Sequence, residues 1–366
     1  MRLPARSRPV RPRRVAAAVV ALTLASSAAA CSGGDDSGSS SQASTSPSPS
    51  PSPSPSTSPP ASPSPSPTPQ LRSALTGLPV TQLGRVLAVK VDNAPLARRF
   101  QVGLDSADVV YEEVAEAGLT RFLAVFASQP APKIGPVRSV RESDLELLRQ
   151  YGKVLFGFSG GNKGVLRTVA RAQIVDVSYD AVPAAYDLRK GERRDAYNFY
   201  TSTSRLLTSR AGGETEKPVG FTFGALPAAA AAAPPVSSVA VPWSDKSSTG
   251  FTYDANNLVW LRSNNGTPAT MSDGARMRAG TVIVQYVATR QSQYVDVAGS
   301  RTPYSVTIGG GKAEIYREGR KIVGQWVRPT ATHGTRFVYA GGTDIPLKPG
   351  PVWVLLVPQG VRITNT

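Results

Sequence analysis

The chain of 366 residues has very little of the two side chains that build most metal and redox sites. It contains one cysteine and one histidine, so it can form no internal disulfide, and the common zinc sites, which need several Cys or His ligands, are excluded. A Ser-His-Asp triad would have to use His333, which lies in a predicted loop. We expect no metal site and no cofactor, and the catalytic residues of any reaction stay unknown at this level.

Acidic residues are absent from the first 30 positions, which carry six arginines. An apolar run from Val15 to Ala25 follows them, and small residues then lead through Ala28-Ala29-Ala30 to Cys31. This order is that of a secretory signal, and the apolar run is too short to span a membrane comfortably. Residues 1–30 are therefore predicted to be a signal peptide. Arg13-Arg14 also permits twin-arginine export, so the export route stays open.

The single cysteine, Cys31, directly follows the expected cleavage site. That position resembles a bacterial lipobox, in which the cysteine receives a lipid, although Ala28 stands where leucine is usual. The alternative is an ordinary cleavage site that releases a soluble protein with a free thiol. A lone cysteine would seldom fall here by chance, so we expect lipidation of Cys31 and attachment to the outer face of the cytoplasmic membrane.

Large apolar side chains are missing from residues 31–70, where Ser and Pro alternate from Ser46 onward. Such a segment buries too little apolar surface to offset the cost of ordering its backbone. We interpret it as a lipid-anchored, disordered linker that acts as a spacer. A ligand for a proline-binding domain, or an O-glycosylated stalk, is the alternative.

The formal net charge is +16, and removal of the six leader arginines leaves +10. A charge of this size suits anionic surfaces. The expected partners are the membrane, reached through the lipid, and an anionic envelope polymer or an envelope protein. Nucleic acid is disfavoured by the export signal rather than by the charge.

Residues 71–223 alternate between strand and helix patterns. Strands are expected at 86–91, 109–111, 121–127 and 154–158, and helices at 142–150 and 164–172. Strands interleaved with helices favour an α/β domain with a partly parallel sheet.

Residues 224–236 are rich in alanine and proline and read as a linker, and residues 237–366 then contain many short strands with tight turns. The predicted fold class is therefore α+β or α/β, with an N-terminal mixed α/β domain followed by a mainly antiparallel β domain. Trp260, Trp326 and Trp353 are interpreted as core residues of the second domain rather than as sugar platforms.

Three polar loops follow predicted strands of the first domain and would converge if those strands are parallel. Ser139 and Glu142 have the spacing of a helix capping box, so the neighbouring arginines would flank a helix start that favours an anion. Small residues and a lysine occupy a second strand-to-helix turn, which also suits phosphate or carboxylate. The candidate ligand-binding residues are Asp92, Asn93, Glu113, Arg138, Ser139, Arg141, Ser159, Gly160, Gly161 and Lys163.

Glu112, Glu113 and Glu116 form an acidic group beside Tyr111. Alternation along a strand puts Glu113 on the face of Tyr111 and Glu112 on the opposite face, so the two neighbours are not a catalytic pair. Salt bridges to Arg121, Arg138 or Arg141 are one interpretation. The other is a ligand-facing acid, or a hard-cation ligand together with Asp92.

Several segments together resemble the YerB-like lipoproteins, a two-domain family of unknown function (DUF3048 N-terminal and C-terminal domains). The resemblance covers about residues 75–358 and implies an envelope lipoprotein, but no catalytic residue can be transferred from it. The segments that carry it are Lys90-Val91-Asp92-Asn93, Ala107-Asp108-Val109-Val110-Tyr111-Glu112, Thr120-Arg121-Phe122-Leu123-Ala124, Ile134-Gly135-Pro136-Val137-Arg138-Ser139-Val140-Arg141, Ala196-Tyr197-Asn198-Phe199-Tyr200-Thr201-Ser202 and Gly324-Gln325-Trp326.

Two functions are compatible with these features. The leading hypothesis is a membrane-anchored cell-envelope lipoprotein that binds an anionic ligand or a wall-associated partner through the α/β domain. The alternative is a hydrolase or transferase acting on cell-wall material, with Asp92, Glu113 or Glu116 as acid or base. A carboxyl group with a raised pKa inside a cleft near Asp92 would favour the enzyme.

Overall fold

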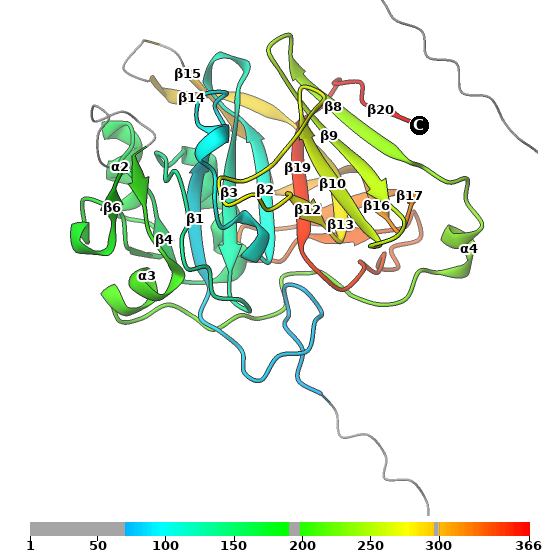
Figure 1. The fold of residues 1–366 in the computed structure, drawn as a ribbon, viewed down its shortest axis with the longest axis horizontal. Helices are drawn as coiled ribbons and strands as arrows, with labels where there is room; N and C mark the ends of the chain where they lie inside the picture. Colours follow the sequence, from blue (N-terminus) through cyan, green and yellow to red (C-terminus); the bar gives the residue numbers. More distant parts are fainter. Residues whose placement is uncertain (1–69, 190–197, 296–298, 300) are drawn as a thin grey trace, which may run out of the picture. The chain divides into compact units, whose positions relative to one another are not determined.

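One large mixed sheet organises the chain (Figure 1). The computed structural model describes residues 70–189, 198–295, 299 and 301–366. The predicted signal peptide, Cys31 and the Ser/Pro-rich tract up to residue 69 lie outside the described residues, as do Ala196 and Tyr197. None of the helices within the described ranges is long and apolar enough to cross a membrane.

The large sheet has ten strands, and both halves of the chain contribute to it. In spatial order they are β18 (Arg336–Val338), β17 (Arg320–Arg328), β16 (Gly309–Arg317), β13 (Thr281–Val287), β19 (Val352–Pro358), β2 (Val109–Val114), β3 (Thr120–Phe126), β1 (Leu87–Asp92), β4 (Val154–Gly157) and β5 (Ile174–Asp176).

Five central strands of this sheet run in the same direction. β13, β19 and β2 are parallel neighbours, and β1 is parallel to β4. β3 is antiparallel to both β2 and β1, so β1 has the direction of β2. The carboxyl ends of β13, β19, β2, β1 and β4 therefore lie along one edge of the sheet, which we call the carboxyl edge.

A second, antiparallel sheet covers one face of the large sheet. It consists of β11 (Thr267–Pro268), β10 (Val259–Asn264), β9 (Ser247–Asp254), β8 (Ser238–Ser244) and β20 (Thr364–Asn365), with β12 (Arg278–Ala279) paired to β10. Its inward residues share a core with the alternating Leu87, Val89 and Val91 of β1. Helix α3 (Thr203–Ser209) contributes Leu206 to the same core.

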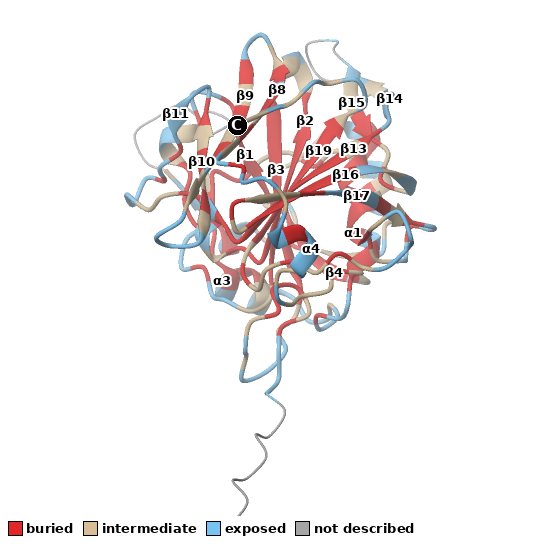
Figure 2. Cartoon of the chain, turned by 90° about the vertical axis from the view of Figure 1, so that its right-hand side faces the viewer, coloured by how far each residue is buried: buried red, intermediate tan, exposed pale blue. Residues whose placement is uncertain are grey.

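Two short helices cover the opposite face. Helices α1 (Glu142–Leu148) and α2 (Lys163–Val169) bury Leu145 and Val165 in a core that contains Ala88, the residue of β1 that points away from the first core. Figure 2 shows the consequence, because the central strands of the large sheet are buried between their two covering layers. The remaining elements are the hairpins β14 (Thr289–Val295) with β15 (Arg301–Ser305) and β6 (Asp187–Leu188) with β7 (Phe199–Tyr200), and the helix α4 (Ala228–Ala231).

Aromatic side chains join the two sheets. The ring of Trp353 in β19 meets Phe122 of β3 edge to face at a centroid distance of 5.4 Å, and Phe251 of β9 at 5.6 Å. Trp260 of β10 meets Tyr316 of β16 in the same way. Trp260, Trp326 and Trp353 are all buried, so their interpretation as core residues is confirmed.

The predicted fold class is confirmed, with few helices and a mixed sheet in the N-terminal part and mainly antiparallel strands in the C-terminal part.

One feature was not predicted. Strand β19 lies between β13 and β2, so both parts build one sheet. The segment 224–236, read as a linker, contains the one-turn helix α4 and joins two parts that share this sheet. The boundaries at 71–223 and 237–366 stay predictions.

Candidate functional site

The three polar loops meet at the carboxyl edge only in part. Because β3 is antiparallel to β1, the loop after β3 begins with Ser128 and Gln129 at the opposite edge, and its later residues up to Arg141 reach the carboxyl edge. The backbone N–H of Arg138 donates to the carbonyl of Lys90 at 2.8 Å, which ties the second loop to the end of β1. Ser159 then donates to the carbonyl of Arg138 at 3.0 Å, and Val140 donates to that of Gly160 at 3.0 Å. The loop after β3 therefore runs between the loops that follow β1 and β4, which brings the candidate residues of all three together.

Asp92 and Asn93 face the protein interior. Both are fully buried. Asp92 accepts the backbone N–H of Ala94 at 2.9 Å and lies 3.2 Å from Nε of Arg121 and 3.1 Å from Nε of Arg138. Asn93 donates to Glu112 and to Thr120. These two residues hold the loop and its arginines in place, and neither presents a polar group to solvent.

Three guanidinium groups gather around Asp92 and Glu116, and we call Arg121, Arg138 and Arg141 the arginine cluster. Nη2 of Arg141 lies 2.6 Å from Oε2 of Glu116. The side chain of Arg138 is 26% exposed and that of Arg141 12%, whereas that of Arg121 is 7% exposed. The cluster is therefore an ion-pair network with one open side.

The cluster has more cationic charge than its carboxylates compensate. Burial lowers the pKa of Arg121, Asp92 opposes this, and the nearby charges of Arg141 and Arg138 lower it further. Nε of Arg121 and Nε of Arg138 are buried against Asp92, and Nε of Arg141 is buried as well. An anion on the open side would therefore bind at the exposed end of the Arg138 side chain and reduce the repulsion among the three cations.

The predicted capping box at Ser139 is wrong. Helix α1 begins at Glu142, and its N-cap residue is Arg141, whose backbone N–H donates to Oδ2 of Asp144 at 2.7 Å. The loop stays extended up to Arg141 because its backbone pairs with β1 and with the loop after β4. Ser139 instead offers its carbonyl to Nη1 of Arg141 at 2.9 Å.

The loop after β4 forms one wall of the open side. The hydroxyl of Ser159 donates to the carbonyl of Val137 at 3.0 Å. Gly160 has a φ of 105°, and nothing lies within 4 Å of where its Cβ would be, whereas Gly161 packs closely on Val140. Lys163 is exposed at the first position of α2.

Glu113 belongs to a buried cluster beneath the edge. Nζ of Lys90 lies 2.5 Å from Oε1 of Glu113 and 2.6 Å from Oδ1 of Asp144, and all three side chains are at most 3% exposed. Burial and the charge of Glu113 raise the pKa of Asp144 to about 7, although Lys90 opposes the shift. Burial also acts to raise the pKa of Glu113, but Lys90 outweighs it and the net shift is downward. Burial likewise raises the pKa of Asp108 to about 6. Both carboxyl groups with a raised pKa are closed off from solvent rather than placed in a cleft.

Glu112 points to the opposite face of the sheet, as alternation predicted. It accepts two hydrogen bonds from Nη2 of Arg262, at 2.9 and 3.0 Å, and both side chains are fully buried. This pair joins β2 of the large sheet to β10 of the covering sheet. Glu116 forms its salt bridge with Arg141, which confirms the ion-pair interpretation for that residue.

A cavity of about 610 Å³ continues the carboxyl edge beyond Glu116. It lies at the ends of β2 and β19 and under the β14–β15 hairpin, and we call it the edge groove. Its charged lining residues are Glu116, Arg290 and Arg301. The full lining is Val114, Ala115, Glu116, Ala117, Gly118, Thr289, Arg290, Gln291, Arg301, Pro303 and Pro358.

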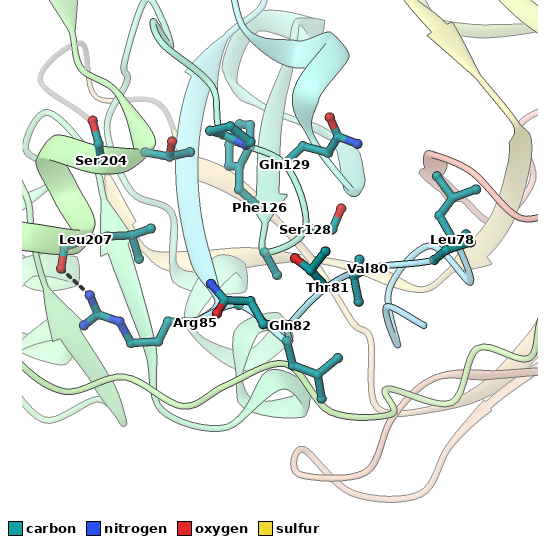
Figure 3. A pocket seen from close by; sticks show the side chains of 16 residues that line it. Leu78, Val80, Thr81, Gln82, Arg85, Phe126, Ser128, Gln129, Ser204 and Leu207 are labelled. Carbon is teal, nitrogen blue, oxygen red and sulfur yellow. Dashed lines mark hydrogen bonds between the residues drawn. The ribbon is translucent and has the colours of Figure 1, made fainter. Parts of the chain in front are cut away.

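Another cavity, of about 740 Å³, opens at the opposite edge of the sheet, near the start of β1 and the end of β3 (Figure 3). Its lining is mostly neutral. The guanidinium of Arg85 is turned toward the carbonyl of Leu207 and also donates to that of Gly212. This cavity therefore has fewer cationic donors for an anion than the arginine cluster has.

Sequence reasoning missed three residues of the site. Arg121 was named only as a salt-bridge partner, yet its register opposite Asp92 on paired antiparallel strands places it at the centre of the cluster. Arg290 and Arg301 come from a hairpin far along the chain, and no local pattern pointed to them. Among the described residues no group of three or more metal-ligating side chains occurs.

Comparison with known proteins shows the family of this chain. Residues 75–216 match the "Protein of unknown function (DUF3048) N-terminal domain" and residues 239–354 match the corresponding C-terminal domain. The chain belongs to the DUF3048 family. As a member of this family it is 28% identical over 314 residues to "Putative lipoprotein YerB" of Bacillus subtilis (strain 168), which covers 79% of this chain and 87% of the relative.

The DUF3048 fold is also known from a crystal structure. The YerB protein from Bacillus subtilis superposes with a TM-score of 0.68 at 24% sequence identity, covering 81% of this chain and all of that one. This likeness supports the fold described above and carries no information on activity. The resemblance read from the sequence is thereby confirmed.

Proposed function

We propose that this protein is a cell-envelope lipoprotein whose exported part binds an anionic, phosphate-bearing ligand at the arginine cluster. Similarity to a relative named a putative lipoprotein supports the anchor, together with the leader and the position of Cys31. Lipid on Cys31 would hold the protein at the outer face of the cytoplasmic membrane, and the Ser/Pro-rich tract would space the folded part from it.

The observation that carries the binding function is the convergence of Arg121, Arg138 and Arg141 on one partly open spot. Asp92 and Glu116 supply two negative charges to three cations. Charge-assisted hydrogen bonds from guanidinium groups to phosphate oxygens are strong and directional. The loop after β4 is tied to Arg138 by the N–H of Ser159, and it carries the open side of Gly160 and the exposed Lys163.

Titration with inorganic phosphate, followed by thermal unfolding, tests this function. A ligand that binds only the folded state adds about 2.7 kcal/mol at a hundredfold excess over its dissociation constant, which corresponds to a rise of several degrees in Tm. We expect this rise for the wild type and not for the double variant Arg138→Ala/Arg141→Ala. Sodium chloride at matched ionic strength should produce no comparable rise.

Arg171→Ala is the matched control, because it removes an exposed arginine next to the far end of α2. It should keep the full response to phosphate. If neither the wild type nor the control responds, and the double variant merely melts at a lower temperature, then the arginines serve only their ion pairs with Asp92 and Glu116 and the proposed function is wrong.

The anchor has its own test. If Cys31 is lipidated, detergent should be required to extract the protein from membranes, and Cys31→Ser should release it or leave it unprocessed. Equal recovery of both forms from the medium, each cleaved before residue 31, would contradict the anchor while leaving phosphate binding open.

A further inference from the structure

We infer that the ligand is a linear phosphodiester polymer, which binds along the carboxyl edge from the arginine cluster into the edge groove. This inference rests on the proposed function, because it takes the cluster as the site of one phosphate. It adds that the same chain continues past Glu116 to Arg290 and Arg301. A polymer with phosphates at intervals would contact both groups of arginines at once.

Glu116 connects the arginine cluster to the edge groove. Oε2 of Glu116 lies 2.6 Å from Arg141 of the cluster, while Oε1 accepts the hydroxyl of Thr302 in β15 at 2.6 Å. Glu116 also lines the edge groove. Burial acts to raise the pKa of Glu116, but Arg141 outweighs it and lowers the pKa to about 2. Glu116 is thus paired with Arg141, and the carboxylate beside Arg290 is the more distant Glu142 at 3.9 Å.

Arg290 and Arg301 retain capacity to bind an anion. Arg290 lies with its guanidinium 3.6 Å above the ring of Tyr304, and its side chain is 51% exposed. Its carboxylate contact within the described chain is Glu142, at 3.9 Å. Arg301 donates through Nη1 to the carbonyls of Ser292 and Gln293. A guanidinium carries five N–H donors, so both arginines, which line the groove, have donors beyond these contacts.

The size and charge of the site favour a polymer over a single ion. The edge groove of about 610 Å³ is far larger than the roughly 30 Å³ that one water occupies, and one phosphate would leave most of it empty. Along this edge Arg121, Arg138, Arg141, Arg290 and Arg301 lie with the carboxylates Asp92, Glu116 and Glu142. Five cations against three anions leave a surplus of two positive charges, spread along the edge rather than at one point.

The β14–β15 hairpin is built to hold the groove arginines at this edge. Ser292 donates to Glu142 and Tyr304 donates to Glu146, each at 2.6 Å, so the hairpin is bound to helix α1 by two hydroxyls. Figure 1 shows the hairpin at the same edge as the ends of the central strands. The groove therefore has walls from both halves of the chain.

Binding of glycerol phosphate oligomers of increasing length to the full exported chain tests the inference. Occupation of two linked sites raises affinity by about 10²-fold to 10⁴-fold over one site. We expect an oligomer of about ten repeats to bind at least about 100-fold more tightly than inorganic phosphate, and a single repeat to bind no better than phosphate. The affinity for the long oligomer should fall steeply with salt, because each contacted phosphate releases counterions.

The double variant Arg290→Ala/Arg301→Ala separates this inference from the proposed function. This variant should lose most of the increase in affinity with oligomer length, and it should keep the rise in Tm with inorganic phosphate. Arg290→Lys/Arg301→Lys should restore most of the increase in affinity with oligomer length. That result would show that the alanine variant loses affinity because charge is removed and not because the hairpin is damaged. Arg171→Ala should behave as the wild type in every titration.

Three results would overturn the inference. An affinity independent of oligomer length, with phosphate still bound at the cluster, would limit the site to a single anion. Equal length dependence in wild type and in Arg290→Ala/Arg301→Ala would place the polymer elsewhere. Binding to phosphatidylglycerol vesicles that is stronger than to the long oligomer, and is lost in the same variant, would identify a lipid surface as the occupant. Failure of phosphate to bind at all would instead remove the proposed function.

Discussion

At the scale of single residues, the site is supported by a buried ion network that has no access to a ligand. Lys90 compensates two carboxylates, Glu113 and Asp144, in a space without solvent access. A buried charge is tolerated only when it is paired and hydrogen-bonded. The hydroxyl of Ser143 completes the cluster by donating to Glu113 at 2.7 Å. These residues therefore support α1 and the arginine cluster from below rather than contact a ligand.

Replacing Lys90 with Met should destabilise the fold strongly. The variant leaves two buried carboxylates without their cation, and breaking a buried pair in this way costs about 3–5 kcal/mol. Urea unfolding measures the loss directly. Lys163→Met removes an exposed lysine and should change the unfolding free energy by less than about 0.5 kcal/mol. Similar small effects of both variants would show that Lys90 is not a structural cation.

Asp144 should make stability depend on pH. Its pKa rises from 3.8 in the unfolded chain to about 7 in the folded protein, so the folded state binds the proton more tightly. The resulting stability is fully present below pH 3.8 and is lost as the pH rises through about 7. Asp144→Asn should therefore be less stable than wild type at pH 4, and the difference should shrink toward pH 8. Asp245→Asn makes the same chemical change at an exposed site and is the matched control.

At the scale of elements, the β14–β15 hairpin is the part of the site that the sequence could least foresee. Residues 237–366 were expected to form one mainly antiparallel β domain, but β14 and β15 form a separate hairpin whose hydroxyls bind α1 and Glu116. Its contacts join residues about 150 to 190 positions apart along the chain, and such pairings leave no local periodicity. The strands at 86–91, 109–111, 121–127 and 154–158 were predictable because each contains a short, mainly apolar run between turn residues.

Gly164→Ala should report on the packing of this hairpin against α2. A Cβ at this position would lie 2.2 Å from Cδ1 of Tyr294, which cannot be accommodated without moving the ring. Alanine alone favours a helix interior by about 1 kcal/mol over glycine. We expect the variant to be less stable than wild type, but more stable than its parent in a Tyr294→Ala background. A stabilising effect in both backgrounds would show that the hairpin does not pack here.

At the scale of the whole molecule, the shared sheet makes the two matched family segments depend on each other. Strand β19 near the C-terminus completes the pairing of β2, and Arg262 from β10 compensates the buried Glu112. The change from α/β to β patterns was visible in the sequence. The order of the strands could not be predicted, because β19 pairs with β2 across a long stretch of chain and apolar runs alone do not specify such a pairing.

A single cooperative transition should therefore describe thermal unfolding of the exported chain. The fragment of residues 71–223 should not fold alone. It lacks β19, so the edge of β2 is unpaired, and it lacks Arg262, so the carboxylate of Glu112 loses its cation. Calorimetry of the exported chain and circular dichroism of the fragment provide the measurements. Two separate transitions, or a folded fragment, would show that the parts are independent domains.

The central claim is that an anion binds between Arg121, Arg138 and Arg141 at the carboxyl edge. The most direct measurement is a crystal structure of the exported chain grown with arsenate, whose anomalous signal locates a phosphate analogue without bias. The account predicts a peak on the open side of the cluster, within hydrogen-bond distance of Arg138 and Arg141 and absent in Arg138→Ala/Arg141→Ala. No peak there at saturating arsenate, with Arg138 and Arg141 still paired to Asp92 and Glu116, would contradict it.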